Sequence, residues 1–174
     1  AIELIRQAIA ADRNNAEPRY NLGLIHASLG RDADAIVQNQ KALKLNPRHI
    51  EARTNLGILL LRQGRTRDAT DHLMQVLALN PSQPAYENLA QALLQDGRAG
   101  EALDIVLRGL RDGGSANLKS VFVLIARAID SEEATRHAGL RDALVRALTE
   151  PWCRPRDLAK LCSVILLQQP EITA

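Results

Sequence analysis

Apolar residues recur every three or four positions along this chain, in blocks of about 14 residues separated by polar turns. This spacing is typical of helices that bury one face. The first predicted helix is Ala1 to Ala11, in which Ile2, Ile5 and Ile9 share a face. The same pattern predicts six more helices, at residues 18–29, 32–45, 50–63, 66–79, 84–96 and 99–111. A helix of about 14 residues is only about 20 Å long and marginal alone, so we expect each to be stabilised by its neighbours.

Turn residues mark the ends of these helices. Pro18 lies where the first turn of a helix requires no amide hydrogen. Gly30, Gly64 and Gly97 end the first helix of each pair, and Pro47 ends a second helix. The chain is therefore predicted to run as helix pairs joined by short turns.

The last third of the chain follows a less regular pattern. Residues 112–115 form its most turn-rich stretch, and an apolar helix is predicted from Ala116 to Ile129. Ser131 or Thr135 is expected to cap the next helix, with an inward stripe of Leu140, Leu144, Val145 and Leu148. After a break at residues 151–155, a final helix is predicted over 157–168, with these residues inward: Leu158, Leu161, Cys162, Ile165 and Leu166.

The helix pairs repeat one pattern of small residues. Gly23, Gly30, Ala35, Ala42 and Pro47 recur 34 residues later as Gly57, Gly64, Ala69, Val76 and Pro81. They recur again after 33 residues, more loosely, as Ala90, Gly97, Ala102, Gly109 and Gly114. Such a period is typical of a solenoid whose repeats stack on one another.

These residues resemble the tetratricopeptide repeat, a helix–turn–helix of 34 residues with a Leu-Gly pair in its first helix. The corresponding pairs here are Leu22-Gly23, Leu56-Gly57 and Leu89-Ala90. The resemblance implies an all-α fold, a right-handed α-α superhelix of about ten helices. It also implies an array over residues 1–112, followed by an irregular helical continuation or C-terminal cap over 113–174. Within the array we expect a half-repeat at 1–15 and repeats at 16–49, 50–82 and 83–112.

Two sets of positions in the repeats bear on helix packing. Gly23 and Gly57 are expected to let the helices of a pair approach closely. The sequence departs from the family at its bulky aromatic positions, which weakens the expectation of tight packing by the first helices. The residues that stand there are Arg19, Arg53, His26 and Asn39.

Composition and charge limit the classes of function that this sequence predicts. Of 174 residues 46% are hydrophobic but only 2% aromatic, so Leu, Ala, Ile and Val must fill the core. The net charge is +2 and the basic residues are spread along the chain, so no nucleic-acid partner is predicted. The sequence has neither an apolar run long enough to span a membrane nor a signal peptide, and a cytoplasmic location is predicted.

Candidate chemistry is sparse. His26, His49, His72 and His137 lack the spacing of metal ligands, and a structural or solvent-facing role is expected for them. Cys153 and Cys162 are nine residues apart, which favours reduced thiols over a disulfide or zinc site. No phosphate-binding glycine loop is present either. We therefore predict no catalytic, cofactor or metal site, and no enzyme activity for this chain alone.

One constellation suggests a binding site. Asn21, Asn55 and Asn88 each precede a Leu-Gly or Leu-Ala pair. A side-chain amide both donates and accepts, so three in register could hold an extended peptide by its backbone. This resembles the asparagine ladder of tetratricopeptide proteins whose first helices line a concave groove. The alternative is that these Asn residues serve hydrogen bonds within the repeats.

Neighbouring positions define the predicted groove further. They carry Tyr20, Leu24, Glu51, Ile58, Arg62 and Gln91. The basic residues of a clamp for a terminal carboxylate are absent from the early groove positions, and the groove is slightly acidic at one edge. It suits an extended neutral or weakly basic peptide, bound near the micromolar range.

Three hypotheses for function follow. The first is a protein-interaction module or scaffold that binds a peptide or partner protein in the groove. The second is the substrate-recruiting region of a larger transferase, a glycosyltransferase or methyltransferase whose catalytic domain lies outside this chain. It rests on residues 141–161, which resemble segments of bacterial proteins in which a tetratricopeptide array is followed by a transferase domain, often methyltransferase-like. The third is self-association as a homo-oligomer through the apolar helix at Ala116 to Ile129.

Overall fold

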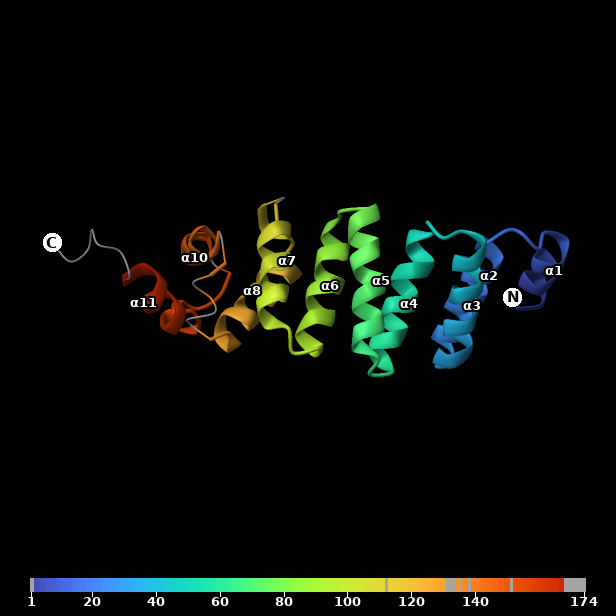
Figure 1. Ribbon diagram of the computed structural model, residues 1–174, viewed down its shortest axis with the longest axis horizontal. Coiled ribbons are helices and arrows are strands. Elements are labelled where there is room, and N and C mark those ends of the chain that lie inside the picture. Colours follow the sequence, from blue (N-terminus) through green and yellow to red (C-terminus); the bar gives the residue numbers. More distant parts are fainter. Residues whose placement is uncertain are drawn as a thin grey trace. The chain divides into compact units, whose positions relative to one another are not determined.

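The computed structural model of the chain is built from helices (Figure 1). It describes residues 2–111, 113–130, 134, 136–137, 139–150 and 152–167. Within these ranges there are ten α-helices and one 3-10 helix, and no strand. The all-α prediction of about ten helices is confirmed.

The chain divides into two compact units, residues 1–81 and 82–174. The helices of the first unit are α1 (Ile2–Ala11), α2 (Glu17–Ser28), α3 (Asp32–Leu45), α4 (Ile50–Arg62) and α5 (Thr66–Leu79). Consecutive helices from α1 to α5 contact one another, and α2 also contacts α4 (Figure 1). The predicted boundaries of these helices are confirmed to within one residue.

The second unit contains α6 (Gln83–Gln95), α7 (Ala99–Arg111), α8 (Ala116–Ala128), α10 (Leu140–Thr149), the 3-10 helix η1 (Pro155–Asp157) and α11 (Ala159–Leu167). Helices α6, α7 and α8 pack mutually, and α11 contacts η1, α8 and α10. The core of this unit is aliphatic apart from Phe122 and Tyr86, as the composition requires.

The two helices of each pair in the first unit approach closely at the predicted glycines. A Cβ atom on Gly57 would lie 2.9 Å from Leu73 Cγ, and one on Gly23 would lie 2.8 Å from Asn39 Nδ2. Ala35 and Ala69, on the second helices, are fully buried. Larger side chains at these glycines would therefore force the helices apart.

Gly30 and Gly64 end α2 and α4 in the left-handed conformation, with φ of 71° and 73°. This lets the chain turn back so that Arg65 N–H bonds Leu60 C=O at 2.9 Å and Arg31 N–H bonds His26 C=O at 2.9 Å. These bonds satisfy carbonyls that the helix ends leave unpaired. Tight turns of this kind place each second helix against the first.

At two of the family's aromatic positions, polar contacts take the place of ring packing. Asn39 is fully buried, and its Nδ2 donates to Ala35 C=O at 2.8 Å. Arg53 donates to the Pro47 carbonyl and to Gln75, and so ties α4 to α5 and to the turn before α4. The bonds of Arg53 thus join α4 to its neighbours, whereas the bond of Asn39 lies within α3.

In the second unit a hydrogen-bonded turn joins α7 to α8. Ser115 caps α8 by accepting from Leu118 N–H at 3.0 Å, and its hydroxyl donates to Glu87 on α6. Gln83 donates to Gly109 C=O at 3.0 Å and accepts from Ser115 N–H at 3.2 Å. Ser115, the last residue of the predicted turn-rich stretch, is therefore attached to α6.

The helices near the C-terminus correct parts of the sequence prediction. In α10 the buried residues are Leu140, Ala143, Leu144 and Ala147, whereas Val145 and Leu148 are 44% and 40% exposed. The predicted stripe was therefore wrong at Val145 and Leu148, because the small alanines lie inward. Helix α11 begins at Ala159 instead of Asp157, which belongs to η1, and Leu158 and Leu161 are buried as predicted. The proposed caps Ser131 and Thr135, the end of the last helix at Gln168 and the side chain of Leu166 lie outside the described residues.

Glu150, which follows α10, connects several side chains of the second unit. Its carboxylate accepts from Trp152 Nε1 at 2.7 Å and from Lys119 Nζ on α8 at 2.9 Å. The hydrogen bond from Trp152, followed by that from Lys119, lowers the pKa of Glu150 to about 2. Trp152 also packs edge-on against Phe122 with ring centroids 5.8 Å apart. We call Glu150, Lys119 and Trp152 the Glu150 clasp.

We predict that Gly57→Leu lowers the free energy of unfolding by about 1–3 kcal/mol or more, because the added atoms overlap Leu73. Combining it with Leu73→Ala should return part of this loss, since the second change opens the occupied space. Urea denaturation of the two single variants and the double variant measures the coupling. Strictly additive losses would show that the close approach of the helices is not the cause.

We also predict a pH effect from the Glu150 clasp. Because the pKa of Glu150 is lowered from 4.5 to about 2 in the folded chain, its stabilising effect is complete above pH 4.5 and is lost as the pH falls through 2. The chain has one Trp, so Trp152 fluorescence follows this region directly. Glu150→Gln should lower the melting temperature at pH 6, and its difference from the wild type should shrink toward pH 2. A difference that is independent of pH would contradict the role of the carboxylate.

Candidate functional site on the first helices

In the first unit, the residues predicted to bind a peptide lie on α2 and α4. Helix α2 carries Tyr20, Asn21 and Leu24, and α4 carries Glu51, Asn55, Ile58 and Arg62. Because α2 and α4 contact each other, the structure brings these two rows together. Leu24 is 40% exposed, Asn21 is exposed, and Tyr20, Asn55 and Ile58 are half-buried. These rows are the candidate site, and we call them the first-helix surface.

The two Asn residues of this surface differ in their surroundings. Asn21 is exposed on α2. Asn55 is half-buried and donates through Nδ2 to Asn39 Oδ1 at 3.4 Å. Asn39 is itself oriented by its bond to Ala35 C=O. The Nδ2 group of Asn55 therefore serves the fold, which was the alternative explanation for this residue. The Oδ1 atom of the same side chain is a hydrogen-bond acceptor.

Asn88 and Gln91 lie on α6 in the second unit. Asn88 is half-buried and Gln91 is exposed. Glu87, beside Asn88, is engaged in the fold because it accepts hydrogen bonds from Ser115 and from Asn117 Nδ2, the latter at 3.2 Å. Since Asn88 belongs to a different compact unit from Asn21 and Asn55, a ladder of all three remains a prediction.

Arg62 is the last residue of α4, whereas Glu51 lies in the first turn at the other end of the same helix. Its Nη1 is 3.6 Å from Asp32 Oδ1 at the start of α3, and its side chain is 57% exposed. Thr54, between the acidic and the amide positions of α4, donates to Ile50 C=O at 2.9 Å. One end of the first-helix surface is therefore acidic, and at the other end Arg62 is paired with Asp32.

The acidic end contains His49, for which a structural or solvent-facing role was expected. His49 caps α4 by accepting from Ala52 N–H at 3.4 Å, and its side chain is 4% exposed. Its Nδ1 lies 3.1 Å from Glu51 Oε2, and its Nε2 lies 3.4 Å from Glu17 Oε1. The Tyr20 ring packs against the imidazole with centroids 5.0 Å apart and planes at 53°. We call Glu17, Tyr20, His49 and Glu51 the acidic cluster.

The pKa of Tyr20 reflects the approach of the two carboxylates of this cluster. The pKa of Tyr20 is raised, first by burial of the phenol and then by the negative charges of Glu51 and Glu17. Both carboxylates thus act on one phenol although they come from different helices. The sequence signal was the recurrence of Glu at the same repeat position, Glu17 and Glu51, with His49 just before α4.

The other candidate groups are distributed through both units. His137 Nδ1 is 2.7 Å from Asp104, His26 is 3.7 Å from Asp34, and burial lowers the pKa of His72. Cys153 and Cys162 are unpaired and half-buried. Among the described residues, no group of three or more His, Cys, Asp or Glu side chains could hold a metal ion. No helix among them is long and apolar enough to cross a membrane.

Comparison with known proteins identifies the repeats. A family model described as tetratricopeptide repeat matches residues 1–50 and 54–117. The structure of YrrB, described as a TPR protein with an unusual peptide-binding site, is similar over 99% of this chain and 96% of that one. Its TM-score is 0.66 at 19% identity. A structure of MamA is similar over 86% of this chain and 84% of that one, with a TM-score of 0.67 at 21% identity.

A match among curated proteins covers a shorter segment. Fifty residues are 42% identical to the human protein O-mannosyl-transferase TMTC3. This segment is 28% of the present chain and 6% of that protein. The chain therefore corresponds to a small part of this relative.

Proposed function

The chain belongs to the tetratricopeptide repeat family, and we propose that it binds an extended peptide on the first-helix surface of its first unit. Members of this family generally serve as non-catalytic scaffolds for protein interaction, so a binding role is the expected one. The finer question is which surface binds and by what chemistry.

The observation that carries the proposal is the pairing of like residues on α2 and α4. Asn21 and Asn55 occupy the same repeat position, as do Leu24 and Ile58, on two helices in contact. Amides in this register offer donors and acceptors to a peptide backbone, and the adjacent apolar side chains offer contacts to its side chains. The description of YrrB as having an unusual peptide-binding site adds support by analogy of fold.

The strength of such binding follows from the groups available. Each hydrogen bond to the peptide adds about 1 kcal/mol net, and ordering of the peptide opposes it. A few such bonds together with apolar contacts give a dissociation constant near the micromolar range. This range suits a recruiting or scaffolding module.

The test uses peptides selected from a random 12-residue phage library on the full chain. Asn21→Ala and Asn55→Ala should each weaken binding about fivefold, because each removes a hydrogen bond to the peptide backbone. Isothermal titration calorimetry with one synthetic selected peptide gives both affinities. Because Asn55 also contacts Asn39, the exposed Asn21 supplies the cleaner comparison.

Gln40→Ala is the matched control, because Gln40 is an exposed amide on the second helix α3. It should leave the affinity unchanged. The proposed surface is wrong if the selected peptides bind Asn21→Ala and Asn55→Ala as tightly as they bind the wild type. It is also wrong if Gln40→Ala is the variant that abolishes their binding.

A second proposal concerns the parent protein. The match to a segment of an O-mannosyl-transferase favours a role in recruiting substrates to a transferase. The resemblance of residues 141–161 to segments in bacterial transferases points the same way. In that case the peptide bound on the first-helix surface would be part of the substrate, and the chemistry would lie in another domain.

This second proposal predicts that the reading frame continues beyond the codon for Ala174 into a domain with transferase motifs. Sequencing the gene on both sides of the present segment tests it. A frame that holds tetratricopeptide repeats alone would contradict the transferase role, and it would leave peptide binding as proposed.

A further inference from the structure

Helix α8 of the second unit has an exposed face that the peptide-binding proposal does not use. The large apolar residues Leu118, Phe122 and Ile125 of this helix are buried in the unit. Leu124 differs from them, because it is 58% exposed. It belongs to a row of exposed residues spaced three or four apart, which therefore share one side of the helix. These residues are Asn117, Ser120, Leu124 and Arg127, and we call them the α8 face.

The two ends of the α8 face carry opposite charges. At the N-terminal end, Glu87 of α6 accepts from Asn117 Nδ2 at 3.2 Å and from the Ser115 hydroxyl. Both donors are neutral groups, so the negative charge of Glu87 is not compensated by them, and a carboxylate has further acceptor sites. Arg127 lies in the last turn of α8, at the other end of the face. Leu124 therefore lies between an acidic and a basic end.

Ser120, one turn before Leu124, is a small residue that a partner can cover. Its hydroxyl donates to Ala116 C=O at 3.0 Å, so its hydrogen is already used within the helix. An apolar side chain placed over Ser120 would therefore leave no donor unpaired. The α8 face thus has a protruding leucine and, one turn away, a small residue that can receive one.

These features are placed symmetrically about the middle of the helix. Positions 120 and 124 lie two residues on either side of position 122, and positions 117 and 127 lie five residues on either side. The two pairs are therefore about 3 Å and about 7.5 Å from this level along the helix axis. When two copies of α8 meet here in antiparallel orientation, Leu124 of each copy faces Ser120 of the other. At the same time Arg127 of each copy faces Asn117 and Glu87 of the other.

We infer that the α8 face is the interface of a homodimer, in which two antiparallel α8 helices pack about a two-fold axis. A second copy is the partner that fits, because one face supplies both the protruding and the receiving side chain as well as both charges. A carboxylate with free acceptor sites also suits the planar donors of an arginine. A contact between two helices is smaller than the interface of a stable dimer, so we expect weak association. The inference concerns the second unit and is independent of peptide binding by the first.

Sedimentation equilibrium of the full chain tests the apolar part of the interface. From about 10 µM to about 1 mM the wild type should show a monomer–dimer equilibrium with a dissociation constant of about 100 µM. Leu124→Gln should weaken it at least about tenfold, because each dimer buries this leucine twice. The matched control is Leu29→Gln, which changes a leucine of similar exposure, 55%, at the end of α2. It should dimerise like the wild type.

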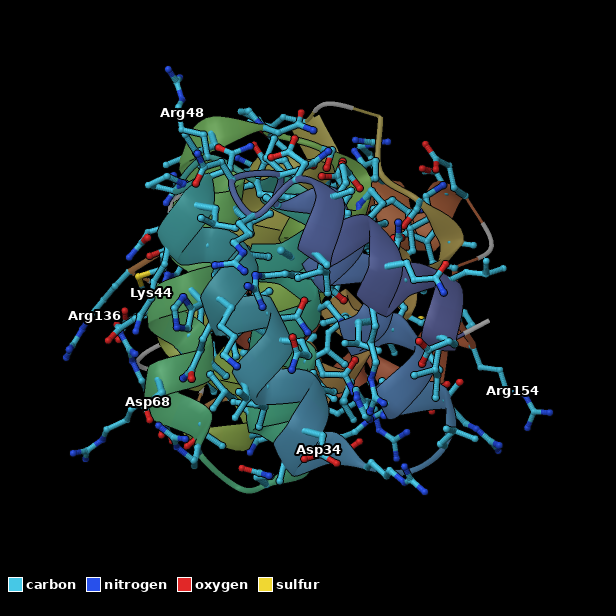
Figure 2. All side chains as sticks on the ribbon, turned by 90° about the vertical axis from the view of Figure 1, so that its right-hand side faces the viewer. Asp34, Lys44, Arg48, Asp68, Arg136 and Arg154 are labelled. Atoms are coloured by element: carbon cyan, nitrogen blue, oxygen red, sulfur yellow. The ribbon has the colours of Figure 1, made fainter. Side chains whose placement is uncertain are left out.

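A charge exchange tests the antiparallel arrangement. Arg127→Glu alone and Glu87→Arg alone should each lose dimerisation, because like charges then meet at both ends of the interface. An equimolar mixture of the two variants should dimerise again, because opposite charges then meet at both ends. The control Arg154→Glu reverses an exposed arginine that extends away from the ribbon (Figure 2), and it should leave dimerisation unchanged. Thermal melts by circular dichroism check that every variant is folded.

Several results would overturn the homodimer. A wild-type chain that stays monomeric over this range does so, and a partner other than this chain must then be sought for the α8 face. Self-association that survives Leu124→Gln, or that is lost in Leu29→Gln or Arg154→Glu, shows that another surface is responsible. If the two folded charge variants do not dimerise on mixing, the antiparallel arrangement is wrong. Should Glu87→Arg fail to fold, Leu124→Gln and Arg127→Glu still decide, because both change exposed residues.

Discussion

The close approach of the two helices of a pair is the constraint on which the rest of the first unit depends. Helices of 12 to 14 residues are marginal alone and must bury their inner faces against neighbours. At Gly57 there is no room for a Cβ atom beside Leu73, and at Gly23 none beside Asn39. Because these glycines and the buried alanines hold the helices together, the opposite positions of α2 and α4 are available for other contacts.

The division between packing and binding residues is nevertheless incomplete. Asn39 occupies the position that Leu73 holds one repeat later, and as a buried amide it binds both its own helix and Asn55. His49 caps α4 and at the same time faces the two carboxylates of the acidic cluster. Residues that support the fold therefore also orient the groups that could meet a partner. Substitutions at Asn39 or His49 would alter both properties together.

Sequence reasoning predicted most of the fold. The 34-residue period, the Leu-Gly pairs and the turn glycines located seven helices almost to the residue, since each signal reflects a local steric requirement. It was less successful in α10, where Ala143 and Ala147 are buried in place of Val145 and Leu148. Without a repeat to align, periodicity alone gives more weight to the larger apolar residues than to small ones that fit a close contact.

The candidate site was also only partly predictable from the sequence. Positions on α2 and α4 follow from the repeat, and so Asn21, Asn55 and Glu51 could be named. The roles of His49 and Asn39 depend on contacts between residues of different helices, such as the approach of His49 to Glu17, which lies 32 positions earlier. A single sequence contains no signal for such a contact. Likewise, engagement of Glu87 by Ser115 joins positions 28 apart.

We propose that the first helices of the first unit form the binding surface while the second helices maintain the fold. The most direct measurement is an NMR titration of the isotope-labelled chain with a peptide selected from a random library. If α2 and α4 bind the peptide, the largest shift changes and the intermolecular contacts fall on these two helices, including the side-chain amide of Asn21. Changes concentrated on α3 and α5, with Asn21 unaffected, would contradict it.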